Sequence, residues 1–133
     1  QDLTLEGGRH VYEAVADLVR CWGYKSSKDA TYSNVGAVVG ATYPLQAKRL
    51  RERMPNTFFL VPGYGAQGAT AKDVAVNFDE FGLGAIVNSS RGIMQAYKHE
   101  RWQGKYAEED WMEAARAEAI RMTEEINRAI FDK

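Results

Sequence analysis

The sequence predicts an α/β fold in which helices alternate with the strands of a parallel sheet. Three short apolar runs carry this prediction, at residues 35–41 (VGAVVGA), 58–61 (FFLV) and 83–87 (LGAIV). Helical patterns separate the runs, and such alternation is typical of βαβ units with right-handed connections. Two architectures fit this order, an open doubly wound sheet and a (β/α)8 barrel. In both, ligands bind at the C-terminal ends of the strands.

Composition and charge argue against several classes of protein. The chain has 133 residues, 45% hydrophobic and 26% charged, which predicts one domain without an internal boundary. The formal net charge of −1 and the lack of a basic run argue against binding to nucleic acid or a membrane surface. No apolar run approaches the roughly 18 residues of a membrane span. The single cysteine, Cys21, favours a reducing compartment, and its place in a helical apolar pattern predicts a buried thiol.

A first helix is expected at residues 8–22, before the sheet. Its apolar residues recur at three- and four-residue steps and predict one inward face, and Gly23 fits the stop position beyond the helix end. Residues 24–34 are polar and lack a period, which predicts a surface loop. The inward positions of the helix are Val11, Ala14, Val15, Leu18, Val19 and Trp22.

The run at residues 35–41 predicts a strand buried on both faces, because neither face carries polar residues. A helix should follow at residues 44–54, with Thr42 as its cap and Pro44 in the first turn, where the missing N–H is no loss. Its predicted inward residues are Leu45, Leu50 and Met54, and its solvent-facing residues are Lys48, Arg49, Arg51 and Glu52.

Further helices are expected after the second and third runs. Thr70 and Asp73 resemble a capping box, for a helix that ends at Gly82 and turns Val74, Phe78 and Phe81 inward. A short helix is expected at residues 90–97 and a long helix at residues 108–131. The long helix should pack through a stripe of Trp111, Ala115, Ala119, Met122, Ile126 and Ile130, with acidic residues on its other face.

The end of the third run carries candidate anion-binding residues, Ser89-Ser90-Arg91-Gly92. A strand ends and a helix begins there, so first-turn N–H groups without a partner in the helix point toward the strand end. Arg91 adds a planar fork of donors that fits two phosphate oxygens, and Gly92 permits close approach. Taken alone, these residues also fit a surface arginine beside a serine-capped helix.

The loop after the second run, residues 62–68 (PGYGAQG), favours the phosphate interpretation. Its glycines permit tight turns that aim several N–H groups inward, and Gln67 can donate to an anion. Two successive glycine-containing strand ends, the second with an arginine, match the phosphate site of eight-stranded barrels. Alone, the loop would fit a flexible turn equally well.

Motifs for other chemistries are absent from the sequence. It contains no HExxH, no CxxC and no cluster of Asp, Glu and His with metal-ligand spacing, so no metal site is predicted. It also lacks a P-loop and a nucleophile elbow. His10 and His99 are expected in solvent, and no strand end carries a Lys or a carboxylate. The pattern indicates a ligand-binding site without an evident acid, base or nucleophile.

Three segments closely resemble the longer bacterial subgroup of orotidine 5′-phosphate decarboxylase: residues 35–44 (VGAVVGATYP), 59–68 (FLVPGYGAQG) and 84–93 (GAIVNSSRGI). The resemblance implies a (β/α)8 TIM barrel in which the three runs are strands six, seven and eight. Residues 1–133 would then be the C-terminal half of a single barrel domain. It also implies a cytoplasmic lyase of pyrimidine biosynthesis, which converts orotidine 5′-monophosphate to UMP and CO2 without a cofactor.

The resemblance further implies roles for individual residues. Gln67 and Arg91 match the residues that hold the substrate phosphate, and Ser90 matches the position whose backbone N–H contacts it. Many relatives have Gly in place of Ser90, a change that a backbone contact should survive. The substrate loop would begin at Pro62 near the pyrimidine and continue through Gly63 and Tyr64, and Tyr64 should help it to close.

The family's alternating Lys and Asp catalytic array has no counterpart in these residues, and the resemblance places it upstream of Gln1. Residues 2–4 look like the segment just after strand five. We therefore expect a fragment that is inactive alone, pairs with the missing N-terminal half and belongs to a homodimer. The alternative is a non-catalytic phosphate-binding half-barrel or flavodoxin-like module. The NSSR and PGYGAQG motifs argue against another phosphate-binding barrel enzyme.

Overall fold

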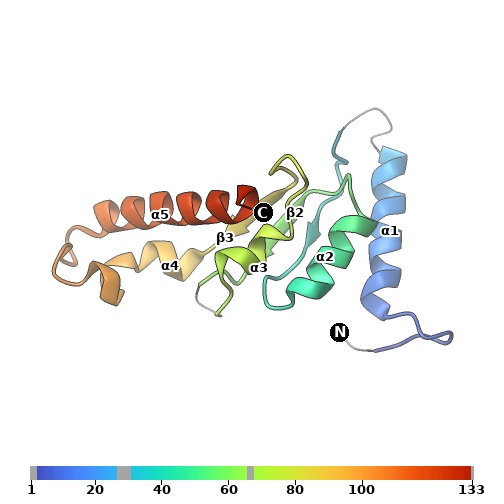
Figure 1. Ribbon diagram of the computed structural model, residues 1–133, viewed down its shortest axis with the longest axis horizontal. Helices are drawn as coiled ribbons and strands as arrows, with labels where there is room; N and C mark the ends of the chain where they lie inside the picture. The colour runs from blue at the N-terminus through green and yellow to red at the C-terminus, as the bar shows by residue number, and fades with distance from the viewer. Residues whose placement is uncertain (1–2, 27–30, 66–67, 133) are drawn as a thin grey trace.

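The computed structural model describes residues 3–26, 31–65 and 68–132. Three parallel strands, β1 (Ala37–Val38), β2 (Phe59–Pro62) and β3 (Ala85–Asn88), lie side by side in chain order. Helices precede, connect and follow the strands (Figure 1). The predicted alternation of helices with a parallel sheet is confirmed.

Helices flank the strands toward both ends of the molecule. Figure 1 shows α1 and α2 at one end and α4 and α5 at the other, with α3 and the strands between them. The α-helices are α1 (Val11–Ser26), α2 (Pro44–Arg53), α3 (Ala71–Ala75), α4 (Ser90–Met94) and α5 (Trp111–Phe131), and two 3-10 turns, η1 (Ala96–Lys98) and η2 (Glu100–Trp102), link α4 to α5.

The strand predicted to be buried on both faces is exposed on one. Val38, Leu60 and Ile86 are aligned by the register of the three strands, and they are 70%, 41% and 57% exposed. Because side chains alternate between faces along a strand, these three residues form one row on one face, called here the exposed row. Among the described residues, helices cover only the opposite face, which buries Phe59 and Val61 completely.

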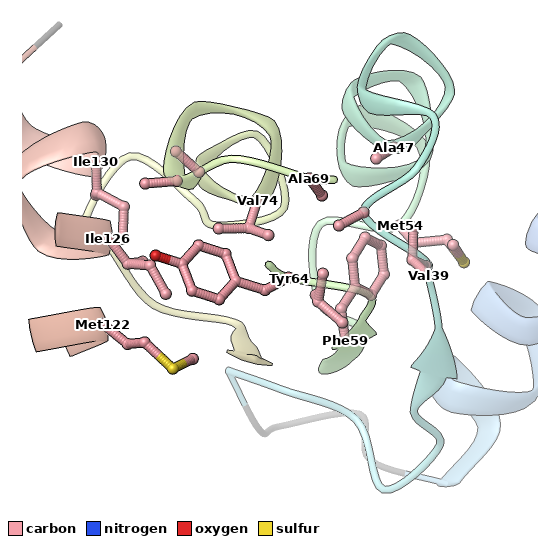
Figure 2. Packing of buried hydrophobic residues seen from close by; sticks show 14 of the residues in the cluster. Val39, Ala47, Met54, Phe59, Tyr64, Ala69, Val74, Met122, Ile126 and Ile130 are labelled. Atoms are coloured by element: carbon pink, nitrogen blue, oxygen red, sulfur yellow. The ribbon is translucent and has the colours of Figure 1, made fainter. Parts of the chain in front are cut away.

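The core lies between that covered face and helices α2, α3 and α5 (Figure 2). Full burial of a side chain such as Phe59 or Val74 contributes about 1.5–3 kcal/mol to stability. The buried cluster includes Val39, Ala47, Met54, Phe59, Val61, Tyr64, Val74, Met122, Ile126 and Ile130.

Arg51 was expected in solvent, and the structure corrects this expectation. Its guanidinium is buried and donates hydrogen bonds of 2.9–3.2 Å to five backbone carbonyl oxygens, and it stacks over the Phe59 ring at 3.7 Å. Burial lowers the pKa of Arg51. The side chain is inward because the carbonyls around the starts of β2 and β3 need donors. Those carbonyls belong to Met54, Pro55, Thr57, Asn77 and Gly84.

Helix α1 runs beyond the expected stop at Gly23, which lies inside it. A Cβ on Gly23 would lie 2.5 Å from the Ser33 Oγ, so the lack of a side chain at Gly23 allows the segment around Ser33 to pack closely against the helix. The predicted inward face is largely exposed, because α2 covers only part of α1. Cys21 is an exposed free thiol, so its predicted burial is wrong.

Other helix predictions are confirmed in part. Thr70 and Asp73 form the expected capping box, but α3 ends at Ala75, well before Gly82. Tyr43 occupies the N-cap position of α2 without a capping side-chain hydrogen bond, and Pro44 begins the helix as predicted. Three predicted inward residues are instead exposed, namely Leu45, Phe81 and Trp111.

Candidate functional site

The ends of β2 and β3 lie at the same level of the sheet. Pro62 pairs with Asn88 in the parallel register, so the segments that follow the two strands start side by side. Parallel βαβ structures place ligands at this edge. The two polar segments singled out in the sequence are therefore neighbours in space, as predicted.

The segment after β2 contains the tight turns that its glycines predict. Gly63, Gly65 and Gly68 all adopt positive φ, a region that glycine enters without strain. The Gly65 N–H donates to the Ala69 carbonyl at 3.0 Å, and the Gly68 N–H donates to the Gly65 carbonyl at 3.0 Å. Gln67, a predicted phosphate ligand, lies outside the described residues.

Ser89 joins the two strand ends. Its buried hydroxyl donates a hydrogen bond to the Tyr64 carbonyl oxygen at 3.2 Å. A Cβ on Gly92 would lie 2.4 Å from the Ser89 Oγ, so the close approach that Gly92 permits is that of a protein side chain. The sequence indicated that Gly92 permits close approach, but it did not reveal Ser89 as the neighbour or its partner in the other segment.

Helix α4 begins at Ser90, where the sequence predicts a helix start, and Arg91 lies exposed in its first turn. The Ser90 hydroxyl donates to the Asn88 side-chain oxygen at 3.2 Å. The Arg91 side chain makes no hydrogen bond or ion pair with any residue that the structure describes. It lines a pocket of about 460 Å³, together with Tyr64, Gly65, Ser89 and Gly92. Pro62, Gly63 and Ser90 do not line this pocket.

The far wall of the pocket is a charged network that the sequence did not predict. Arg121 on α5 pairs with both Glu118 and Glu125, and its two bonds to Glu118 are 2.8 and 2.9 Å long. The Trp102 indole N–H donates to Glu118 at 2.8 Å. Burial acts to raise the pKa of Glu118, but the hydrogen bonds from Arg121 and Trp102 outweigh it and lower that pKa. Glu118 was expected on a solvent face and is buried.

Tyr64 connects this network to the segment after β2. Its side chain is buried, and its hydroxyl donates to the Glu125 carboxylate at 2.8 Å. Burial raises the pKa of the Tyr64 hydroxyl, and the hydrogen bond to Glu125 adds to the increase. Tyr64 and Glu125 are 61 residues apart, and a contact over such a separation leaves no recognisable pattern in the sequence.

The pocket carries an excess of cationic side chains. Arg121 is neutralised by two carboxylates, whereas Arg91 and Arg101 have no ion pair among the described residues. Lys98 and the exposed His99 also line the pocket. Unpaired guanidinium groups beside a helix start suit an oxyanion such as a phosphate ester.

The described residues contain neither a metal-binding cluster nor a membrane-spanning helix. No group of three or more His, Cys, Asp and Glu side chains is arranged to hold a metal ion. No helix among these residues combines the length and the apolar character needed to cross a bilayer.

Comparison with curated proteins gives strong matches to part of a known enzyme. The chain is 48% identical over 127 residues to orotidine 5′-phosphate decarboxylase of Rhodopirellula baltica, covering 95% of this chain and 41% of the relative. It is 42% identical over 130 residues to that of Clostridium acetobutylicum, covering 98% and 44%. The chain thus spans about two fifths of the length of the curated relatives that it matches. No family model matches it.

A solved structure gives the same result. UMP synthase of Leishmania donovani superposes on all of this chain and on 25% of its own length, with a TM-score of 0.72 and 36% sequence identity. The predicted fold class, part of a (β/α)8 barrel, is thereby confirmed. The three-stranded sheet with helices on one face is the corresponding portion of such a barrel.

Proposed function

We infer that this chain is part of an orotidine 5′-phosphate decarboxylase, and we propose that it supplies the substrate-phosphate site of that enzyme. The observation that carries the proposal is Arg91, unpaired in the first turn of α4, lining one pocket with Tyr64 and Gly65 from the segment after β2. The 48% identity to a decarboxylase supports the assignment of the substrate.

Each proposed site residue has a distinct task. Arg91 and Gln67 hold the phosphate oxygens through charged and amide donors, and the Ser90 backbone N–H adds a further donor. Pro62, Gly63 and Tyr64 bring the segment after β2 over the pyrimidine side of the substrate. Pro62 and Asn88 are paired at the ends of β2 and β3, so the segments that follow these strands start side by side. This arrangement supports contact of both segments with one ligand.

The proposed reaction needs no cofactor. The bond between pyrimidine C6 and the carboxylate breaks, CO2 leaves, and the electron pair that remains on C6 takes a proton. By the family resemblance, a Lys outside this chain supplies that proton. The phosphate site contributes binding energy from a part of the substrate that does not react, which holds the ring in place as charge develops at C6.

Assembly with the rest of a barrel is part of the proposal. The exposed row of Val38, Leu60 and Ile86 leaves apolar side chains in water on the face that would line a barrel interior. We propose that the missing N-terminal strands cover this face, that the complete enzyme is a cytoplasmic homodimer, and that the 133-residue chain alone is inactive.

The test is an assay for UMP formation from orotidine 5′-monophosphate. The chain is assayed alone, mixed with the complementary N-terminal half, and as the complete enzyme. We expect turnover only when both halves are present. Turnover by the chain alone would overturn the assignment of the catalytic array to other residues. Binding of UMP without turnover in the complete enzyme would favour the alternative, a phosphate-binding module without catalytic function.

A further inference from the structure

The Tyr64 side chain crosses from the proposed phosphate site into the core. It leaves the segment after β2 and packs between Val74 and Ile126, with its oxygen directed toward α5 (Figure 2). Only 4% of the residue is exposed. A buried phenol hydroxyl needs a hydrogen-bond partner, and the choice of partner fixes the position of the whole ring.

That partner is held in place by other charges. The Tyr64 hydroxyl donates to Glu125 at 2.8 Å, and Arg121 pairs with the same carboxylate. Arg121 is itself held by two hydrogen bonds to Glu118, which also accepts from the Trp102 indole. The acceptor for Tyr64 is thus one end of a network spanning α5 and η2, and a network of charge-assisted bonds restrains its members more than a single bond does.

The backbone of Tyr64 is fixed at the same time from the other side. Its carbonyl oxygen accepts from the Ser89 hydroxyl, and the next N–H, that of Gly65, donates to Ala69. Tyr64 therefore cannot shift without breaking bonds to both α5 and the end of β3. Because Tyr64, Gly65, Arg91, Arg121 and Glu125 line one pocket, the network sets how the segment after β2 faces Arg91.

We propose that Glu125 and Arg121 are positioning residues for phosphate binding, acting through Tyr64. The inference rests on the proposed function, because it assigns them to the same phosphate site. Neither residue is proposed to touch the reacting atoms. Their task is to hold the Tyr64–Gly65 backbone at the distance from Arg91 that a phosphate group requires, so their loss should weaken binding of the phosphate and spare binding of the pyrimidine ring.

The test compares variants of the complete enzyme with two ligands that differ only in the phosphate, UMP and uridine. Glu125→Ala removes the acceptor for Tyr64, and Tyr64→Phe removes the donor. Glu125→Gln keeps an acceptor oxygen and serves as the rescue. Glu124→Ala is the matched control, because Glu124 is the exposed neighbour on the same helix and its side chain makes no hydrogen bond or ion pair with any described residue.

We expect Glu125→Ala and Tyr64→Phe to raise the Kd for UMP by about tenfold or more and that for uridine by less than about twofold. Glu125→Gln should restore most of the UMP affinity, and Glu124→Ala should leave both values unchanged. Equal losses for both ligands would identify a merely structural role and overturn the inference, as would unchanged UMP affinity. Decarboxylation by the unmodified enzyme is measured first, and its absence would refute the proposed function instead.

Discussion

Ser89 donates its side-chain hydrogen bond to the Tyr64 carbonyl oxygen at 3.2 Å, across a sequence separation of 25 residues. This bond joins the ends of two parallel strands at the edge where the candidate site lies. It fits only because Gly92, one turn along α4, has no Cβ in the space that the Ser89 Oγ occupies. The local structure of α4 and the position of the neighbouring segment are therefore coupled.

That coupling predicts a non-additive pair of substitutions. Gly92→Ala should turn the Ser89 hydroxyl away from Tyr64 and lower the free energy of unfolding by about 1 kcal/mol or more, because a buried hydrogen bond is lost. In a Ser89→Ala background the added methyl meets no hydroxyl, so Gly92→Ala should cost clearly less. Urea unfolding of the four proteins in a double-mutant cycle measures the difference. Additive effects would contradict the coupling.

Arg91 is predicted to be essential for catalytic efficiency. Arg91→Ala in the complete enzyme should lower kcat/KM for orotidine 5′-monophosphate by about 100-fold or more, which is roughly 3 kcal/mol of transition-state stabilisation. Arg91→Lys should recover only part of the loss, because an ammonium lacks the planar fork of donors.

The matched control for Arg91 is Arg49→Ala. Arg49 is an exposed arginine on α2, likewise without an ion pair among the described residues. Steady-state kinetics should show little change for this variant. Near-normal kinetics for Arg91→Ala would remove Arg91 from the phosphate site.

Arg51 is predicted to be the most important single polar side chain for stability. Arg51→Ala removes a donor from five backbone carbonyls, of which those of Met54 and Gly84 keep a backbone N–H donor, and it removes the stacking on Phe59. We expect a loss of about 3–5 kcal/mol. Thermal or urea unfolding of the complete enzyme measures the change. Arg49→Ala again serves as the control and should stay within about 0.5 kcal/mol of the parent. A similarly small effect of Arg51→Ala would contradict the role of Arg51.

The raised pKa of Tyr32 predicts a loss of stability at high pH. Burial and the hydrogen bond of its hydroxyl to Asp79, 2.5 Å long, raise the pKa of Tyr32 from 10.0 to about 12. The folded state therefore keeps the phenol proton that the unfolded chain releases above about pH 10. This contribution to stability is complete below pH 10 and is lost as the pH rises toward 12.

The measurement is the free energy of unfolding between roughly pH 9 and pH 12, compared for the parent and Tyr32→Phe. This range includes the pKa of a free tyrosine, roughly 10, and the raised pKa of Tyr32 in the folded state. The variant lacks the titrating group, so its stability should fall less steeply over this range. Equal slopes for the two proteins would show that the Tyr32–Asp79 bond does not couple folding to proton binding.

The exposed row predicts how the chain associates. Leu60→Ser, in the middle of the row, should weaken association of the 133-residue chain with the complementary half, because apolar area no longer leaves water on pairing. Leu45→Ser on α2 removes an exposed leucine away from the sheet and should leave association unchanged. Sedimentation velocity of the mixed halves measures the populations of the free halves and of their complex. Equal association of the two variants would show that this face is not the contact surface.

Local patterns in the sequence determined most of the secondary structure and indicated where the candidate site lies. The apolar runs at β2 and β3, the glycines of positive φ after β2, the Thr70–Asp73 capping box and the start of α4 at Ser90 all depend on neighbours a few residues away. Such interactions are visible in sequence because hydrogen bonds and backbone preferences of this kind have fixed short spacings. The order of strands then brought Pro62 and Asn88 to one edge.

Only the tertiary structure decided which polar side chains are inside. Arg51 looked like a solvated residue of α2, yet it reaches the Gly84 carbonyl 33 residues away. Tyr64 and Glu125 are 61 residues apart and share a hydrogen bond. The burial of such groups depends on which carbonyls and carboxylates lack partners after the elements pack. For the same reason the sequence could not predict that β1 would be exposed on one face, because this depends on which face the helices cover.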